Sequence, residues 1–360
     1  MLHNNNTPFA AIGFEQWHRD GATMACIAVR AEFILREDGL IALADQQEIV
    51  LADEFAGDPQ KTPLIRTSDL VPFKPCTDIT CLGPVVSPDG LPHPTHNASI
   101  EIDQTLRSIR AHGPRIWEAV GDSWRLGEPE PVTDIPLCYS LASGGRVIGH
   151  PDGVVDPRNP IGRNLIHPDY TPKGRNYPAA QIDMPDHSIH DDFNHPPFPQ
   201  GWGPMSPWWQ ARQQFAGTYD DAWRADRHPR LPQDFDYRFY NVAHPDLRAQ
   251  GLLTGKEQIV ATNLGRPGAI RVFLPDTRPY ATFGFKDGRE VVAELNLDGV
   301  HLDFRQTPFR YAITWRGWMD VCPSFLRVDL DFAPIRQVEE MTLLAVGADG
   351  LKDRGSVAKF

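Results

Sequence analysis

Residues 24–50, MACIAVRAEFILREDGLIALADQQEIV, decide the fold class of this chain. Apolar and polar residues alternate along the stretch, and the apolar set is Val29, Ala31, Phe33 and Leu35. The opposite face carries mainly Arg30, Glu32 and Arg36. A period of two is typical of a half-buried β-strand, and Asp38-Gly39 supplies a turn before the apolar residues 40–43. The stretch therefore predicts a β-hairpin followed by a further strand.

Similar alternation predicts strands in the rest of the chain. Residues 98–102 and 106–111 are expected to pair with each other. Further strands are predicted at 258–261, 270–274, 311–315 and 325–330. Residues 291–304, VVAELNLDGVHLDF, carry the strongest hairpin signal, because two alternating runs flank Asp298-Gly299.

Between residues 140 and 235 this periodicity fails, while Pro, Gly, Asn, Asp and His become frequent. Four prolines also predict that residues 58–82 form an extended connector. Short helices are expected only at 208–215 and 220–223. Because long amphipathic helices are absent, the sequence predicts a mainly β protein with antiparallel, sandwich-like sheets, few short helices and a long loop-rich, aromatic-rich middle layer.

We expect four consecutive regions that together form one integrated domain. They are an N-terminal β half at 1–140, an irregular aromatic- and proline-rich layer at 141–250, a C-terminal β half at 251–335, and a tail at 336–360 with one strand at 341–346. The chain of 360 residues is long enough to bury a sizeable core.

The middle layer ends in residues 201–241, where ten aromatic side chains lie among arginines and aspartates. Such residues dominate recognition surfaces, but large irregular cores use them equally. Salt bridges to Asp220, Asp221 and Asp234 are an ordinary alternative role for Arg212, Arg224 and Arg230. We interpret this stretch chiefly as a structural element that locks the irregular layer onto the sheets, with partner contacts on its exposed rim.

The formal net charge is −12, from 47 acidic and 35 basic residues, and no Lys/Arg block accompanies it. This charge argues against nucleic acid or an anionic membrane surface as the main partner, and favours a basic partner. The N-terminus lacks the features of a signal peptide, and no run of ~18 apolar residues could span a bilayer. Five scattered cysteines fit reduced thiols. We therefore expect a cytoplasmic protein without membrane insertion.

Residues 185–197, PDHSIHDDFNHPP, are the sharpest candidate for a metal site. His187, His190 and His195 lie there beside aspartates, and imidazole with carboxylate suits zinc or iron. Their spacing matches no established metal motif, and such clusters also occur in solvated loops. A solvated loop is therefore the expected role, and no cofactor is predicted.

Carboxylates among the tryptophans offer a second chemistry. Asp220-Asp221 and the pair Asp234 and Asp236 could flank a sugar, as in glycoside-hydrolysing clefts. Salt bridges to Arg230 and Arg238 explain the second pair equally well. The chain has no G-x-S-x-G elbow, P-loop or Rossmann glycine pattern, so no catalytic residue is predicted.

Several segments together resemble a bacterial family catalogued as domain of unknown function 2169. In chain order they are DLVPFKPCTDI (69–79), GPRIW (113–117), IPLCYSLASGG (135–145), RNPIGRN (158–164), PMSPWWQAR (204–212), GTYDDAW (217–223) and RHPRLPQDFDYRFYN (227–241). The resemblance covers residues 20–330. The family usually reads close to Y-E-x-A-F-G-G where this chain has Tyr139 to Gly145, with serine replacing both the acidic residue and the phenylalanine.

The resemblance implies an adaptor or chaperone of type VI secretion, whose partners would be a secreted toxin effector, the VgrG spike or a PAAR-type protein. It also marks candidate signature or partner-binding residues. These are Phe73, Lys74, Pro75, Thr77, Asp78, Arg115, Trp117, Asn159, Trp208, Arg212, Gly217, Thr218, Tyr219, Trp223, Pro232, Asp234 and Asp236.

Two functions therefore stay open. The leading one is a non-catalytic interaction protein that binds and docks an effector. The alternative is a hydrolase, carbohydrate-active or metal-dependent, that uses aspartates or histidines of residues 186–236.

Overall fold

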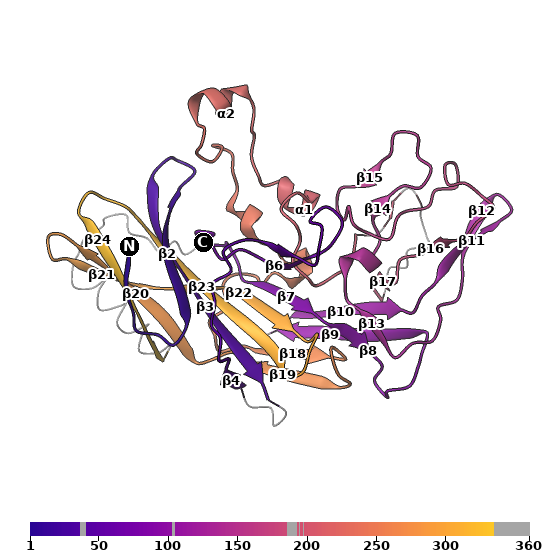
Figure 1. Ribbon diagram of the computed structural model, residues 1–360, viewed down its shortest axis with the longest axis horizontal. Helices are drawn as coiled ribbons and strands as arrows, with labels where there is room; N and C mark the ends of the chain where they lie inside the picture. The colour runs from indigo at the N-terminus through magenta and orange to yellow at the C-terminus, as the bar shows by residue number, and fades with distance from the viewer. Residues whose placement is uncertain (37–40, 103–104, 186–192, 194, 197, 335–360) are drawn as a thin grey trace.

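The computed structural model describes most of the chain (Figure 1). The described residues are 1–36, 41–102, 105–185, 193, 195–196 and 198–334. The expected strand at 341–346 lies outside them. Strands dominate what is described, so the prediction of a mainly β fold with few short helices is confirmed.

The largest sheet has six strands. Five of them follow the order β2 (Ala10–Trp17), β3 (Thr23–Leu35), β23 (Phe309–Asp320), β22 (Asn296–Asp303) and β7 (Asp78–Leu82), and β4 (Ile41–Leu43) pairs with β3. β3 and β4 confirm the predicted hairpin. β7 and β22 run parallel, while the other pairs are antiparallel. Because β23 lies between β3 and β22, the N-terminal and C-terminal β halves share this sheet.

The further strand expected after the hairpin does not form. Residues 44–50 run beside β3 without strand pairing. The amide of Gln47 replaces the ladder there: it accepts a hydrogen bond from the backbone N–H of Glu32 at 2.8 Å and donates one to the carbonyl of Glu32 at 2.9 Å. A side chain thus satisfies the strand edge where backbone pairing stops.

Two other sheets complete the β structure around the core. The first, wholly antiparallel, has the order β17 (Ile182–Asp183), β10 (Thr105–His112), β9 (Thr95–Ile102), β18 (Gln258–Thr262) and β19 (Ala269–Phe273). The second has the order β1 (Leu2–Asn5), β24 (Phe325–Pro334), β20 (Thr277–Phe285) and β21 (Glu290–Glu294), with β1 parallel to β24. The predicted pairing of residues 98–102 with 106–111 is confirmed by β9 and β10.

Smaller elements carry the rest of the chain. The minor strands are β5 (Glu54–Phe55), β6 (Leu64–Arg66), β8 (Pro84–Val86), β11 (Ile116–Val120), β12 (Ser123–Leu126), β13 (Asp134–Pro136), β14 (Gly145–Arg146), β15 (Val155–Asp156) and β16 (Tyr177–Pro178). The helices are α1 (Gln210–Gln213) and α2 (Asp221–Asp226), with 3-10 turns η1 (Tyr139–Leu141), η2 (Tyr237–Tyr240) and η3 (Pro245–Leu247). Neither α-helix has the length and apolar character needed to cross a membrane.

One hydrophobic core joins the three large sheets. Val29 of β3, Ile100 of β9 and Phe283 of β20 are all completely buried in it. The alternation of β3 explains its contribution, because its odd-numbered residues from 25 to 35 face this core. The even-numbered Arg30 is also buried, so the opposite face of the six-stranded sheet is covered as well.

The hairpin predicted at 291–304 is wrong. β21 and β22 belong to different sheets, and β22 runs straight through Asp298-Gly299 with a bulge between Leu297 and Gly299. Gly299 does not take the left-handed backbone that a tight Asp-Gly turn requires. The Asp298 side chain is instead completely buried beside Arg316.

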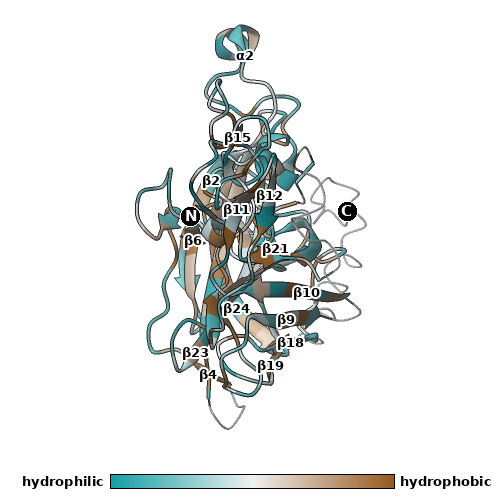
Figure 2. Cartoon of the chain, turned by 90° about the vertical axis from the view of Figure 1, so that its right-hand side faces the viewer, coloured by the Kyte–Doolittle hydropathy of each residue, from teal (hydrophilic) through white to brown (hydrophobic). Residues whose placement is uncertain are grey.

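The irregular region 141–250 forms loops beside the sheets, and one part of it projects. Figure 1 and Figure 2 both place α2 at the far end of a long excursion from the rest of the molecule. We call residues 217–234 the arm. Helix α2 has no buried residue, so contacts with the body do not explain why it stands there.

Candidate functional site

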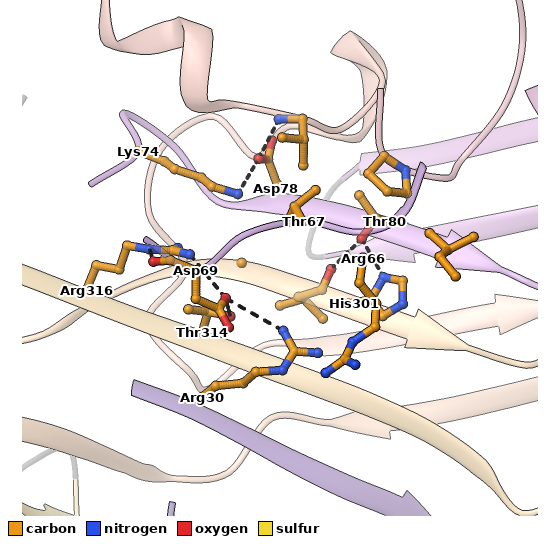
Figure 3. Close-up of a pocket in the computed structure, with 15 residues that line it drawn as sticks. Arg30, Arg66, Thr67, Asp69, Lys74, Asp78, Thr80, His301, Thr314 and Arg316 are labelled. Atoms are coloured by element: carbon orange, nitrogen blue, oxygen red, sulfur yellow. Dashed lines mark hydrogen bonds and ion pairs between the residues drawn. The ribbon is translucent and has the colours of Figure 1, made fainter. Parts of the chain in front are cut away.

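A network of buried charges covers the outer face of the six-stranded sheet (Figure 3). It combines side chains from the sheet with side chains from the segment 66–78. The members that carry the argument are all buried, at most 7% exposed: Arg30, Asp69, Lys74, Asp78, Asp298 and Arg316. Buried charges are stable only when they are paired and hydrogen-bonded, so the pairing decides what this site does.

Arg316 of β23 holds one half of the network. Its guanidinium contacts the Asp298 carboxylate, and it donates to the Asp69 carboxylate at 3.3 Å and to the Asp69 carbonyl at 3.2 Å. Arg30 is the cross-strand neighbour of Thr314, and its guanidinium lies 3.8 Å from the Asp69 carboxylate. Asp69 also accepts from the backbone N–H of Val50 at 2.9 Å. The connector segment is thereby fastened to the sheet by two arginines.

Asp78 holds the other half. Its carboxylate accepts from Lys74 Nζ at 2.9 Å, Asn241 Nδ2 at 3.0 Å, and the backbone N–H groups of Val242 and Ala243 at 2.8 and 3.3 Å. Burial by itself would raise the pKa of Asp78, but Lys74 and these donors outweigh it and hold the pKa below its usual value. One carboxylate therefore joins β7 to residues 241–243, at the end of the irregular layer.

Thr77 makes a second link at the same place. Its hydroxyl donates to the carbonyl of Leu297 at 2.5 Å and accepts from the N–H of Leu253 at 2.8 Å. The half-buried Pro75 lies between the buried Lys74 and Thr77. The residues of the FKPCTDI segment thus fasten three parts of the chain together.

The space left inside the network is small. The cavity among Arg30, Asp69, Lys74 and His301 measures about 30 Å³. This volume suits about one water molecule and is far below that of a typical small-molecule site. The geometry therefore assigns these charges to holding the layer on the sheet, in preference to binding a ligand.

Aromatic rings pack beside the charges. Phe73 lies 4.3 Å from Tyr237 and 5.7 Å from Trp318, measured between ring centroids, and Phe235 lies 5.6 Å from Tyr237. Nearby, Trp208 stacks on Phe55 at 5.3 Å. The segment PQDFDYRFYN is therefore packed on the body, as the expected structural element would be.

Arg212 is buried next to this cluster, and it forms no salt bridge with the described aspartates Asp220, Asp221 and Asp234, so that alternative role is wrong for it. Its guanidinium donates to the carbonyls of Phe239 at 2.9 Å and Met205 at 3.0 Å, and lies 4.9 Å from the Phe239 ring centroid. Burial lowers the pKa of Arg212 to about 10, so the side chain stays charged at neutral pH. Arg212 therefore links the segments around Met205 and Phe239 by donating hydrogen bonds to the backbone carbonyls of both residues.

Three other signature candidates are also buried. Arg115 donates to the carbonyl of Ala180 at 2.7 Å and to the Asp183 carboxylate at 3.2 Å. Asn159 donates to two carbonyls of the 139–145 loop, those of Tyr139 and Ser143, at 2.8 Å each. Trp117 belongs to a small separate core with Trp124, Ile166, Tyr177 and Ala179.

Hydrogen bonds between Thr218 and Asp234 close the arm at its base. We call this pair of residues the clasp. Asp234 accepts from the backbone N–H of Thr218 at 3.0 Å and from its hydroxyl at 2.7 Å. Gly217 has a φ of +77°, and a Cβ there would lie 2.9 Å from both Asp234 Oδ1 and the buried Pro232. Only glycine fits this position.

Rings stiffen the distal part of the arm. Trp223 Nε1 donates to the carbonyl of Arg230 at 2.9 Å, and the Trp223 ring packs against Tyr219 at 4.7 Å and His228 at 5.3 Å. The Tyr219 side chain nevertheless remains 52% exposed. Unlike PQDFDYRFYN, the segment GTYDDAW is not packed on the sheets.

Three aspartates of the arm, and Asp236 just after it, make local contacts. Asp220 caps α2 by accepting from the N–H of Trp223, Asp221 pairs with Arg224 at 2.8 Å, and Asp236 pairs with Arg238 at 2.5 Å. Asp234 forms the clasp with Thr218 and not the expected bridge to Arg230. His187 and His190 lie outside the described residues, whereas His195 is described. Among the described residues, no three His, Cys, Asp or Glu side chains are placed to hold a metal ion.

The sequence model of a protein family described as "Uncharacterized protein conserved in bacteria (DUF2169)" matches residues 20–316. The chain belongs to this family. No curated protein and no solved structure matches it. The matched span of the DUF2169 chain contains the charge network, the rings of Phe73, Phe235 and Tyr237, and the whole arm.

Sequence reasoning missed part of the network in this DUF2169 chain. Arg316 was not singled out, and Asp298 was interpreted as a turn residue. The sequence did contain a signal for Arg316. This residue directly follows the strand predicted at 311–315, and its neighbours on both sides are mainly aromatic or apolar. A charge inside a strand that is apolar on both sides indicates a buried partner.

The network region also contains a histidine that should make stability depend on pH. Burial of His244 lowers its pKa to about 4, although Asp246 lies 3.7 Å away. A lowered folded-state pKa means that the unfolded chain takes up the proton first. We expect the free energy of unfolding to fall between pH 6.5 and pH 4 by up to about 3 kcal/mol. Urea denaturation at several pH values measures this, and His244→Gln should remove this part of the fall.

Proposed function

We propose that this DUF2169 chain is a cytoplasmic, non-catalytic adaptor or chaperone that binds a type VI secretion effector and helps to load it onto the VgrG or PAAR spike. The resemblance of its segments to a family with that association supports the proposal. The charge of −12 supports a protein partner with a basic surface. The observation that carries the proposal is the arm.

The signature candidates divide into two sets by their contacts. One set, which includes Lys74, Asp78, Arg115 and Arg212, is buried and holds loops on the sheets. The other set builds an arm whose helix α2 buries nothing in this chain. A helix that projects and buries no residue makes no contribution to the core, so contact with another molecule is the function that best accounts for it.

Hydrogen bonds within the arm and to the body hold the arm in one conformation. The clasp between Thr218 and Asp234 fixes its base, and the Arg227 guanidinium donates to the carbonyl of Leu231 and reaches the carbonyl of Arg19 on the β2–β3 turn. A binding segment that is already ordered loses less conformational entropy when its partner docks. The adaptor would act by docking and shielding, with no bond made or broken.

Shortening the arm tests the proposal. The tagged full-length chain, recovered from cells that carry its secretion genes, should retain an identified toxin effector or spike protein at moderate salt. A variant with residues 219–233 replaced by a short Gly-Ser link across the clasp should retain at least tenfold less of that protein. Its denaturation midpoint provides the control for folding. If the full-length chain retains neither an effector nor a spike component, the adaptor function is wrong.

A further inference from the structure

We propose that the tip of the arm, residues 219–226, docks onto a basic protein surface, with the Tyr219 ring and the outward aspartates receiving Lys or Arg side chains. This inference rests on the proposed adaptor function and names the chemistry of the partner surface. It is carried by the way the arm separates its aromatic, acidic and basic side chains.

The aromatic part of the tip is exposed yet held in place. Tyr219 is 52% exposed, and its ring meets the Trp223 ring at 4.7 Å with an interplanar angle of 70°. Trp223 is in turn held by the carbonyl of Arg230. An exposed tyrosine face that needs no rearrangement is well suited to a cationic side chain, which a ring quadrupole attracts.

The charges of the tip are acidic on the outside. Residues 219–226 contain three aspartates and one arginine, and none of them is buried. Arg224 pairs with Asp221 at 2.8 Å, so the acidic excess is left on the surface. Asp20, on the adjacent β2–β3 turn that Arg227 contacts, adds another exposed carboxylate.

The basic residue that follows the tip is turned inward. Arg227 donates to the carbonyl of Leu231 at 3.1 Å and to that of Arg19. Its charge is therefore used within the chain to support the arm. The surface offered to a partner is consequently a tyrosine ring flanked by carboxylates.

Charge complementarity selects the occupant of this surface. A second copy of the chain carries the same net charge of −12 and would meet the acidic tip with an acidic surface. A basic surface instead gains Coulomb attraction with the aspartates and a cation–π contact with Tyr219. A basic face of the effector or of the spike is therefore the partner that the tip fits.

The test measures binding of a decalysine peptide by titration calorimetry at low salt. In the tip variant, Asp221→Lys and Asp226→Lys reverse two charges, while Asp220 is kept because it caps α2. The matched control carries Glu128→Lys and Asp152→Lys and so has the same net charge. These exposed acids follow β12 and precede β15, two strands that lie away from α2 (Figure 1). We expect about tenfold weaker binding for the tip variant and at most about twofold for the control. Equal weakening in the two variants would overturn the inference.

A further variant and a co-purification separate this inference from the proposed function. Tyr219→Ala leaves every charge in place and should weaken decalysine binding severalfold; unchanged affinity would remove the cation–π contact from the inference. An effector retained equally by the native chain and the tip variant would leave the adaptor function intact and reject the basic docking surface. If the native chain self-associates in sedimentation and the tip variant does not, the tip binds a second copy of the chain and the basic docking surface is rejected. Denaturation midpoints confirm that each variant is folded.

Discussion

Asp78→Ala is expected to lower the free energy of unfolding by about 3–5 kcal/mol. The substitution removes the carboxylate that joins Lys74, Asn241 and the N–H of Val242. It leaves Lys74, a residue that is only 6% exposed, without the carboxylate that its ammonium group contacts. An unpaired buried charge is among the costliest defects that a single substitution can create. Urea denaturation at pH 7, followed by tryptophan fluorescence, measures the loss.

The double variant Lys74→Met with Asp78→Leu tests the physical reason. Replacing both partners by apolar residues removes the charges together, so it should cost clearly less than Asp78→Ala alone. The double-mutant cycle should then give a coupling energy of about 2–3 kcal/mol. A loss below about 1 kcal/mol for Asp78→Ala would show that Asp78 does not hold the irregular layer on the sheet.

The pH dependence gives an independent check of the same carboxylate. The pKa of Asp78 is held below its usual value in the folded chain, so its stabilising contribution is complete above the unfolded value near 3.8. The contribution is lost only as the pH falls through the lower folded-state value. Asp78→Ala should therefore flatten the acid limb of the stability curve below about pH 4.

Arg212→Ala is expected to cost about 3 kcal/mol or more. Arg212 is 5% exposed, and its guanidinium donates to the carbonyls of Phe239 and Met205, which would lose these donors together. Each orphaned buried acceptor costs about 1–3 kcal/mol, and the packing against the Phe239 ring is lost as well. Gln210→Ala, at an exposed position of the same helix, is the matched control and should change stability by less than about 0.5 kcal/mol. Similar losses in both variants would contradict the role assigned to Arg212.

How far the fold follows from the sequence depends on how local each signal is. The β3–β4 and β9–β10 hairpins were predicted correctly, because alternation and a short connection specify both strands and their pairing. Residues 291–304 show the opposite case. An Asp-Gly dipeptide between alternating runs has the composition of a turn, but β21 and β22 each pair with a different sheet, and those partners lie elsewhere in the chain.

The same difference between local and long-range signals applies to the residues of the candidate site. Lys74, Thr77 and Asp78 were singled out through their resemblance to a family segment, while their roles were not. Asp298 and Arg316 could be paired only once β22 and β23 were placed side by side. For Arg212 the sequence offered many aspartates, and the structure shows backbone carbonyls instead. Composition cannot distinguish such acceptors, because every residue carries one.

The stretch 201–241 likewise could be a core or a surface by composition alone. By itself the sequence determined the β-rich class, two hairpins, the position of the irregular layer and the acidic charge, since each follows from local pattern or from summed composition. Only the tertiary structure decided that PQDFDYRFYN is packed on the sheets while GTYDDAW leaves them as the arm. The reason is physical: burial of an aromatic ring or an aspartate depends on partners such as Phe73 and Thr218, and folding alone brings those partners near.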